Sequence, residues 1–102
     1  MTTEEQTFWM KKIVDASTNL DREWDAFAKS TGADTDSPLG ESVWRCFDVM
    51  LNSVADLTGF SRDAISWFVY ENECGHKKMS QSFPDGKMRP VKNVADFVKA
   101  NQ

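Results

Sequence analysis

Apolar residues recur at helical spacing through the first third of the chain. Their separations are 4, 3, 4, 4 and 3, at Trp9, Ile13, Ala16, Leu20, Trp24 and Phe27. Such spacing places them along one side of an α-helix. Thr2 or Thr3 is suited to cap its start, and Gly32 is suited to end it. Because residues 17–19 are weak helix formers, residues 1–31 are predicted to form either one helix or a helix pair.

A second stretch repeats these separations. Its apolar positions are Leu39, Val43, Cys46, Met50, Val54 and Leu57, widened by Trp44, Phe47 and Leu51. Ser37 and Pro38 suit a helix start, since proline is tolerated at the first helical position. The sequence therefore predicts a helix over residues 38–58, and the short connection favours an antiparallel pair with the preceding segment.

A third apolar stretch follows Gly59, which is expected to end the second helix. Ser61 is suited to cap a helix over residues 61–73, and its apolar residues are Ala64, Ile65, Trp67, Phe68, Val69 and Tyr70. Since these residues leave nearly every side of the helix apolar, we expect it to lie at the centre of the core with Trp67 buried. The same run of Val, Phe and Tyr would also suit a strand.

The helical period stops at Gly75. Pro84, Asp85 and Gly86 are typical turn residues, because Pro fixes φ, Asp bonds back to the backbone and Gly tolerates positive φ. This turn predicts a small hairpin that pairs residues 80–83 with residues 87–91.

Asn93 is suited to cap a last short helix over residues 93–100, whose apolar side is formed by Val94, Phe97 and Val98. The predicted fold class is therefore mainly α, a bundle of three to four helices with a β-hairpin near residues 80–91. A length of 102 residues suits a single domain over residues 1–102, since domains usually hold about 100 to 150 residues.

The chain lacks the sequence features of a membrane or exported protein. No stretch approaches the roughly 18 consecutive apolar residues that span a bilayer. Residues 1–6 lack the basic and then apolar order of a secretory signal. We therefore expect a cytoplasmic protein whose Cys46 and Cys74 remain reduced thiols.

The charge is unevenly distributed around a net value of −4. Residues 1–50 hold ten acidic and five basic side chains, whereas residues 75–92 hold five basic side chains and the single acid Asp85. The basic segment is suited to steer an acidic partner, and the acidic first helix, with Glu4, Asp15, Asp21 and Asp25, is the competing binding surface.

Candidate chemistry is sparse. Cys46, Cys74 and His76 are zinc-type ligands, but three ligands without a second Cys-x-x-Cys pair match a closed zinc site poorly. Cys74 with His76 is too close in sequence to favour a nucleophile and its base. Glu71 and Glu73 with His76 leave open a metal-dependent enzyme component, and no glycine-rich phosphate loop is present. We expect no cofactor.

The second half of the chain carries a recognisable pattern. Residues 67–79 read WFVYENECGHKKM, followed by Asp85-Gly86 and by Arg89-Pro90-Val91 with Val94, Asp96, Phe97 and Val98. From Trp44 onward the chain resembles a family of small uncharacterised proteins encoded by tailed bacteriophages and prophages. The resemblance implies an accessory gene product in a bacterial host cell rather than an enzyme, and it implies no catalytic residue.

These observations favour a non-enzymatic protein-binding function. The expected partner is a bacterial host or defence protein that the chain modulates or inhibits, as an anti-CRISPR or anti-restriction protein does. The alternatives are a DNA mimic or nucleic-acid adaptor and a metal-dependent enzyme component. The residues expected to contact the partner are Glu71, Asn72, His76, Lys77, Lys78, Lys87 and Arg89.

Overall fold

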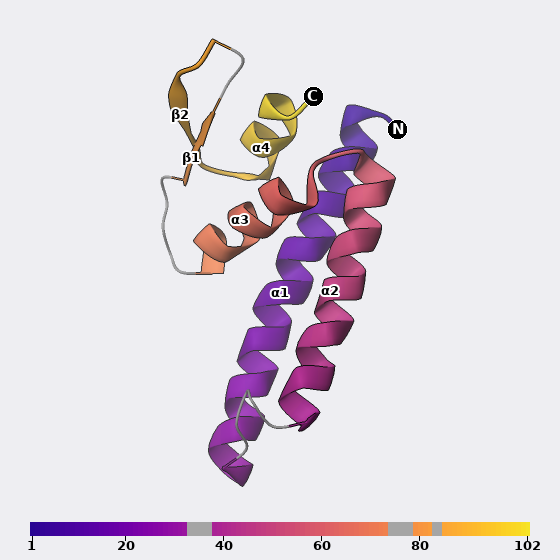
Figure 1. Cartoon of the computed structure of the whole chain (residues 1–102), viewed down its shortest axis with the longest axis vertical. Coiled ribbons are helices and arrows are strands. Elements are labelled where there is room, and N and C mark those ends of the chain that lie inside the picture. Colours follow the sequence, from indigo (N-terminus) through magenta and orange to yellow (C-terminus); the bar gives the residue numbers. More distant parts are fainter. Residues whose placement is uncertain (33–37, 74–78, 83–84) are drawn as a thin grey trace.

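The computed structural model describes residues 1–32, 38–73, 79–82 and 85–102. These residues form four helices and one two-stranded antiparallel sheet (Figure 1). In chain order the elements are α1 (Thr3–Thr31), α2 (Pro38–Thr58), α3 (Arg62–Glu73), β1 (Met79–Ser82), β2 (Met88–Val91) and α4 (Val94–Ala100). The predicted fold class, a mainly helical bundle with a small hairpin, is confirmed.

Helix α1 is continuous over 29 residues. Thr2 and Glu5 form a reciprocal capping box at its start, and Gly32, with φ of 70°, ends it by donating its N–H to the carbonyl of Ala28. Ser17, in the stretch of weak helix formers, is buried on the side that carries the core. Packing therefore outweighs the low helix propensity at this point, and the helix does not break.

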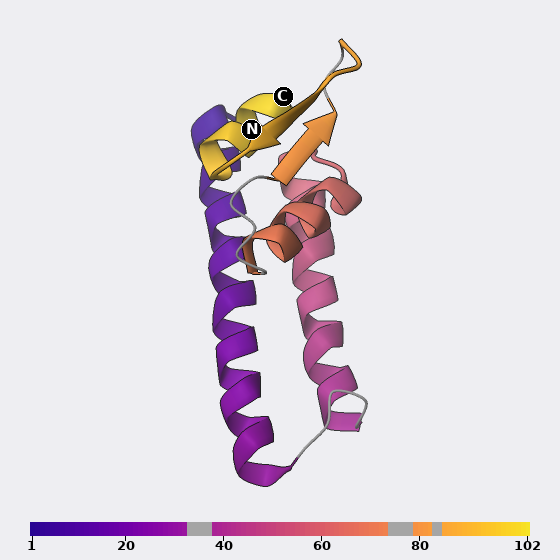
Figure 2. The ribbon, with the colours of Figure 1, turned by 90° about the vertical axis from the view of Figure 1, so that its left-hand side faces the viewer.

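Helices α1 and α2 lie side by side and antiparallel, and the remaining elements pack at one end of this pair (Figures 1 and 2). The side-chain amide of Gln6 donates to the carbonyl of Thr58 at 3.0 Å, which joins the start of α1 to the end of α2. Arg62 binds Asn52 at 2.6 Å and Asp48 at 3.2 Å, which anchors the start of α3 on α2.

The hydrophobic core lies where α3, α4 and β2 meet the α1–α2 pair. Phe97 of α4 is fully buried, with its ring centroid 5.7 Å from that of Phe60 and 4.8 Å from that of Phe68. The other buried members are Met10, Ile13, Leu51, Val54, Ile65, Val69, Val91 and Val98. Figure 2 shows α3 in front of the α1–α2 pair, with the other half of that pair extending beyond it.

The prediction that Trp67 is buried is wrong. Helix α3 packs on the bundle through Ile65, Phe68 and Val69, whereas 51% of Trp67 and 56% of Tyr70 remain exposed. A helix at the periphery of a small bundle has neighbours on one side only, so an apolar residue on its other side stays in water.

The two predicted apolar stripes are buried only in part, at Ile13 and Trp24 of α1 and at Val54 of α2. On α1 the buried residues are Met10, Ile13, Ser17 and Trp24, and on α2 they are Gly40, Leu51, Val54 and Thr58. Several stripe residues are instead exposed, namely Phe27, Leu39, Cys46, Met50 and Leu57. The reason is that α3 and α4 contact a side of α1 and of α2 that is rotated from the predicted stripe by about one residue position.

The hairpin pairs Met79 with Val91 and Ser82 with Met88. In its turn the carboxylate of Asp85 accepts the backbone N–H of Lys87 at 3.0 Å. Gln81 and Asn101 exchange side-chain hydrogen bonds of 2.8 and 3.1 Å, which tie β1 to the end of α4. Asn93 caps α4 by accepting the backbone N–H of Asp96.

Candidate functional site

Two aromatic side chains stack on the outer side of α3. The ring centroids of Trp67 and Tyr70 are 6.2 Å apart, and the planes of the two rings differ by 29°. The spacing of three residues brings both side chains onto one side of the helix. Neighbouring Ile65, Phe68 and Val69 are buried in the core, so the rigid part of the molecule holds the aromatic pair in place. We call Trp67 and Tyr70 the aromatic pair.

The predicted contact residues around this pair are only partly described. Glu71 and Asn72 lie in the last turn of α3, immediately after Tyr70, and their side chains lie outside the described part of the structure. His76, Lys77 and Lys78 lie outside the described residues altogether. The backbone thus places two of the predicted residues within one turn of the aromatic pair.

Lys87 and Arg89 lie on a different surface. Both are exposed, and the hairpin turn that carries Lys87 projects away from α3 in both views (Figures 1 and 2). Arg89 forms an ion pair with Asp85. The backbone N–H of Lys87, and then the Arg89 guanidinium, hold the pKa of the Asp85 carboxyl below its usual value. Arg89 is therefore engaged in the turn as well as exposed to a partner.

The competing acidic surface is spread along α1. Glu4, Asp15 and Asp25 are exposed and Asp21 is half-buried, over a helix of 29 residues. Acids that are several turns apart do not converge on one point, so they form a diffuse negative field rather than a compact site.

The metal hypothesis falls mostly on residues that are not described. Cys46 is exposed on α2, whereas Cys74 and His76 lie outside the described residues. Across the described ranges, no group of three or more His, Cys, Asp or Glu residues is arranged to hold a metal ion. Within the same ranges, no helix has the length and apolarity needed to cross a membrane.

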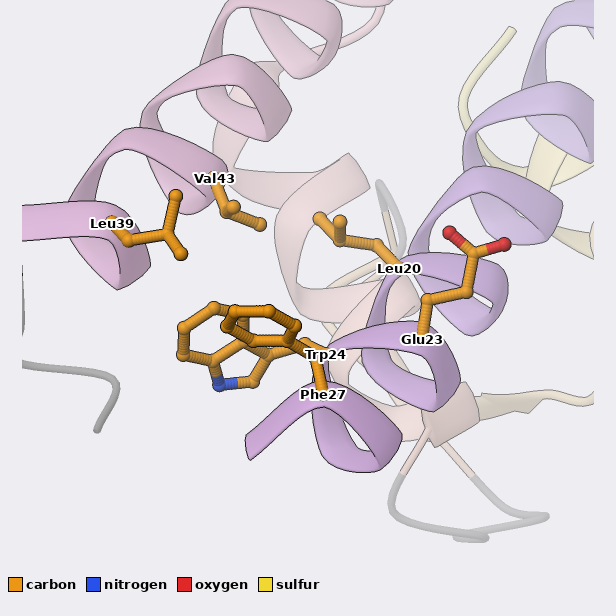
Figure 3. A pocket seen from close by; sticks show the side chains of 6 residues that line it. All are labelled: Leu20, Glu23, Trp24, Phe27, Leu39 and Val43. Carbon is orange, nitrogen blue, oxygen red and sulfur yellow. The ribbon is translucent and has the colours of Figure 1, made fainter. Parts of the chain in front are cut away.

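The structure also reveals an apolar pocket between α1 and α2 that the sequence did not single out. The pocket has a volume of about 240 Å³ and is lined by Leu20, Glu23, Trp24, Phe27, Leu39 and Val43 (Figure 3). The rings of Trp24 and Phe27 lie 5.7 Å apart at 34°. The pocket lies in the half of the helix pair that extends beyond α3.

A second pocket of about 210 Å³ lies further along the same pair of helices. Residues that line it include Trp9, Lys12, Ile13, Met50, Val54 and Leu57. We call the side of the α1–α2 pair that carries both pockets the groove face. The signal for it is present in the sequence as the two predicted apolar stripes.

Comparisons of the chain with protein-family models, with curated proteins and with solved structures found no match.

Proposed function

We propose that this protein is a non-enzymatic protein-binding protein whose recognition surface is centred on the aromatic pair, Trp67 and Tyr70. The observation that carries the proposal is the exposure of two stacked aromatic rings on a helix whose other side is anchored in the core. Single exposed apolar residues are common on protein surfaces. Two stacked rings form a larger and more rigid apolar surface, which supports a contact with another protein.

The chemistry of the pair suits such a contact. Tryptophan and tyrosine are enriched among the residues that contribute most to binding energy, because they bury a large area at a small cost in conformational entropy. Truncation of such a residue typically costs about 2 kcal/mol or more of binding energy. Each ring also carries one polar group, so the pair suits a partner pocket that is apolar with a polar edge.

We propose that Glu71 and Asn72 extend this surface and that the basic residues which follow them in the sequence contribute charge. The two polar residues follow the aromatic pair directly along the helix, and a polar rim around an apolar centre is typical of transient interfaces. His76, Lys77 and Lys78 follow within a few residues in the sequence. Their charge is suited to accelerate association with an acidic partner surface.

The resemblance of residues 44–98 to small phage and prophage proteins supports a bacterial host as the cellular setting. Under this proposal, the partner is a host or defence protein, such as a component of a CRISPR or restriction system, and binding modulates or inhibits it. The hairpin residues Lys87 and Arg89 form a second, separate patch that contributes to electrostatic steering.

The proposal is tested by affinity capture from a bacterial lysate with the full chain, followed by measurement of Kd for the captured protein. Replacement of both Trp67 and Tyr70 by Ala is expected to weaken binding about 30-fold or more, since roughly 2 kcal/mol corresponds to that factor. Met88→Ala, which removes an exposed apolar side chain from the hairpin, is the matched control. Equal capture by the double variant and the wild type would contradict the proposal.

A further inference from the structure

The groove face is apolar, and no described element of the chain covers it. Phe27, Leu39, Met50 and Leu57 are each between 40% and 50% exposed. Both pockets open on this face, one in each half of the α1–α2 pair. An apolar face that follows two helices over most of their length is typical of a helix-packing interface.

Helix geometry separates the exposed residues of this face from the core, and the buried Ile13 and Val54 lie at the boundary between the two. Successive residues are about 100° apart around an α-helix. Two adjacent residues can therefore lie on the two different sides of the α1–α2 pair, one on the groove face and one on the core side. Met50 and Leu57 are exposed on the groove face, whereas Leu51 and Thr58, one position later, are buried beneath the core elements. Helices α3 and α4 pack on the core side (Figure 2).

The charged residues of the groove face have opposite signs at its two ends. Lys12 lines the pocket near the start of α1, and Glu23 lines the pocket further along. The Nζ atom of Lys12 lies 5.2 Å from the ring centroid of Phe8, which keeps the ammonium group near the edge of the groove. In Figure 3 the Glu23 carboxylate points away from the apolar cluster formed by the other five side chains.

Along the helix axes, each apolar stripe is nearly symmetric about its midpoint, and the two midpoints lie at nearly the same height in the α1–α2 pair. Trp9 and Phe27 are equidistant from residue 18, and Leu39 and Leu57 are equidistant from residue 48. The hydrogen bond between Gln6 and Thr58 sets the alignment of the antiparallel helices, so residue 18 lies within about half a turn of the level of residue 48. A two-fold axis at this level superimposes each stripe on itself in reverse to within one residue position.

From these observations we propose that the groove face binds the groove face of a second copy of this chain in an antiparallel, two-fold arrangement. In this dimer α1 packs on α1 and α2 packs on α2, which yields a four-helix bundle of two layers. Lys12 of each copy meets Glu23 of the second copy, and Trp9 of each copy meets Phe27 of the second. A parallel two-fold arrangement brings the two Lys12 residues to one level and forms no such charge pair.

The available area is that of a weak self-association. The uncovered apolar area of the groove face is on the order of 400 Å² for each copy, judged from side chains of this size and exposure. Two such faces together bury on the order of 800 Å² of apolar surface, which is below the roughly 1,200 Å² of a stable interface and is typical of a weak one. This size predicts an equilibrium between monomer and dimer.

The dimer goes beyond the proposed function and does not depend on it. The aromatic pair lies on α3, on the core side, so dimerisation leaves it accessible in both copies. A dimer therefore presents two recognition surfaces that face away from each other, which raises the apparent affinity for a partner that is itself multivalent.

Sedimentation equilibrium of the full chain over a range of concentrations tests the proposal. We expect a rise from the monomer mass of 11.6 kDa to twice that value. Met50→Glu places like charges near the two-fold axis and is expected to raise the dimer Kd about 100-fold or more. The control is Met88→Glu, which adds the same charge to the exposed hairpin and should leave the dimer unchanged.

Charge reversal tests the antiparallel arrangement. Lys12→Glu or Glu23→Lys alone is expected to weaken the dimer roughly 3- to 10-fold, and the double exchange is expected to restore it. Zero-length carbodiimide coupling should yield a Lys12–Glu23 cross-linked peptide. Three turns separate these residues within one helix, so the product reports a contact between copies.

A chain that remains monomeric at high concentration overturns the dimer. A dimer that Met50→Glu does not weaken, or a double exchange that fails to restore binding, also overturns it. If Met50→Glu instead abolishes capture of a lysate protein by a monomeric chain, the groove face binds a different protein and the proposal is wrong. The self-association results leave the proposed function untouched, since that function is tested by capture with the Trp67 and Tyr70 variants.

Discussion

Replacement of Phe97 by Ala is expected to be among the most destabilising single changes in this protein. Phe97 is fully buried, and its ring packs between those of Phe60 and Phe68. Deletion of a buried phenylalanine ring typically costs about 3 to 5 kcal/mol, because apolar contacts are lost and a cavity remains. Part of that cost comes from the two ring contacts, each worth about 0.5 to 1.5 kcal/mol.

This loss is large relative to the stability of a small domain. A chain of 102 residues is expected to unfold with a free energy in the range of about 5 to 15 kcal/mol. We therefore expect Phe97→Ala to lower Tm by roughly 15 to 30 °C. The change also detaches α4 from α3, because Phe97 is the residue of α4 that contacts Phe68.

Trp67→Ala is the informative comparison, since tryptophan is larger than phenylalanine and a composition-based argument would rank it first. Half of Trp67 is exposed, so its removal is expected to cost about 2 kcal/mol, less than the removal of the fully buried Phe97. Urea unfolding followed by far-UV circular dichroism measures both values. A cost for Trp67→Ala equal to that for Phe97→Ala, or a cost below about 1 kcal/mol for Phe97→Ala, would refute this description of the core.

Three further predictions concern local structure. The pKa of Glu5 is lowered by its hydrogen bonds with Thr2. The helicity that the capping box adds should therefore be present at neutral pH and lost as the pH falls through that pKa. Glu5→Gln should remove this pH dependence from circular dichroism spectra. Gly86→Ala should destabilise the hairpin by about 1 kcal/mol in urea unfolding, because φ is 82° there. Gln81→Ala should accelerate hydrogen exchange in β2 relative to α2, because its hydrogen bonds to Asn101 are lost.

Local signals in the sequence were sufficient to locate the elements. Helix spacing, the Thr2 and Asn93 caps, Gly32 and the Asp85-Gly86 turn each act over a few residues, so they operate in the same way in any tertiary setting. The fold class follows from these signals, because a chain with four helical segments and one hairpin has few other ways to bury its apolar residues.

The candidate sites were less accessible to sequence reasoning. Charge composition drew attention to residues 75–92, and only Lys87, Arg89 and Lys92 of that basic cluster lie in the described part of the structure. The sequence does not predict the exposure of Trp67, because that exposure depends on where α3 docks. No residue pattern within α3 distinguishes its outer side, since both sides are apolar.

Tertiary packing alone decided which side of each helix is buried. The separations of 4, 3, 4, 4 and 3 establish that α1 and α2 carry an apolar stripe, but they do not state which neighbour covers it. Helices α3 and α4 contact a side of α1 and of α2 that is rotated from the stripes by about one residue position. Met10, Leu51 and Thr58 are therefore buried, and the stripes line the groove face. The burial of Ser17 likewise kept α1 unbroken. Periodicity is a property of one helix, whereas burial is a property of the contact between helices.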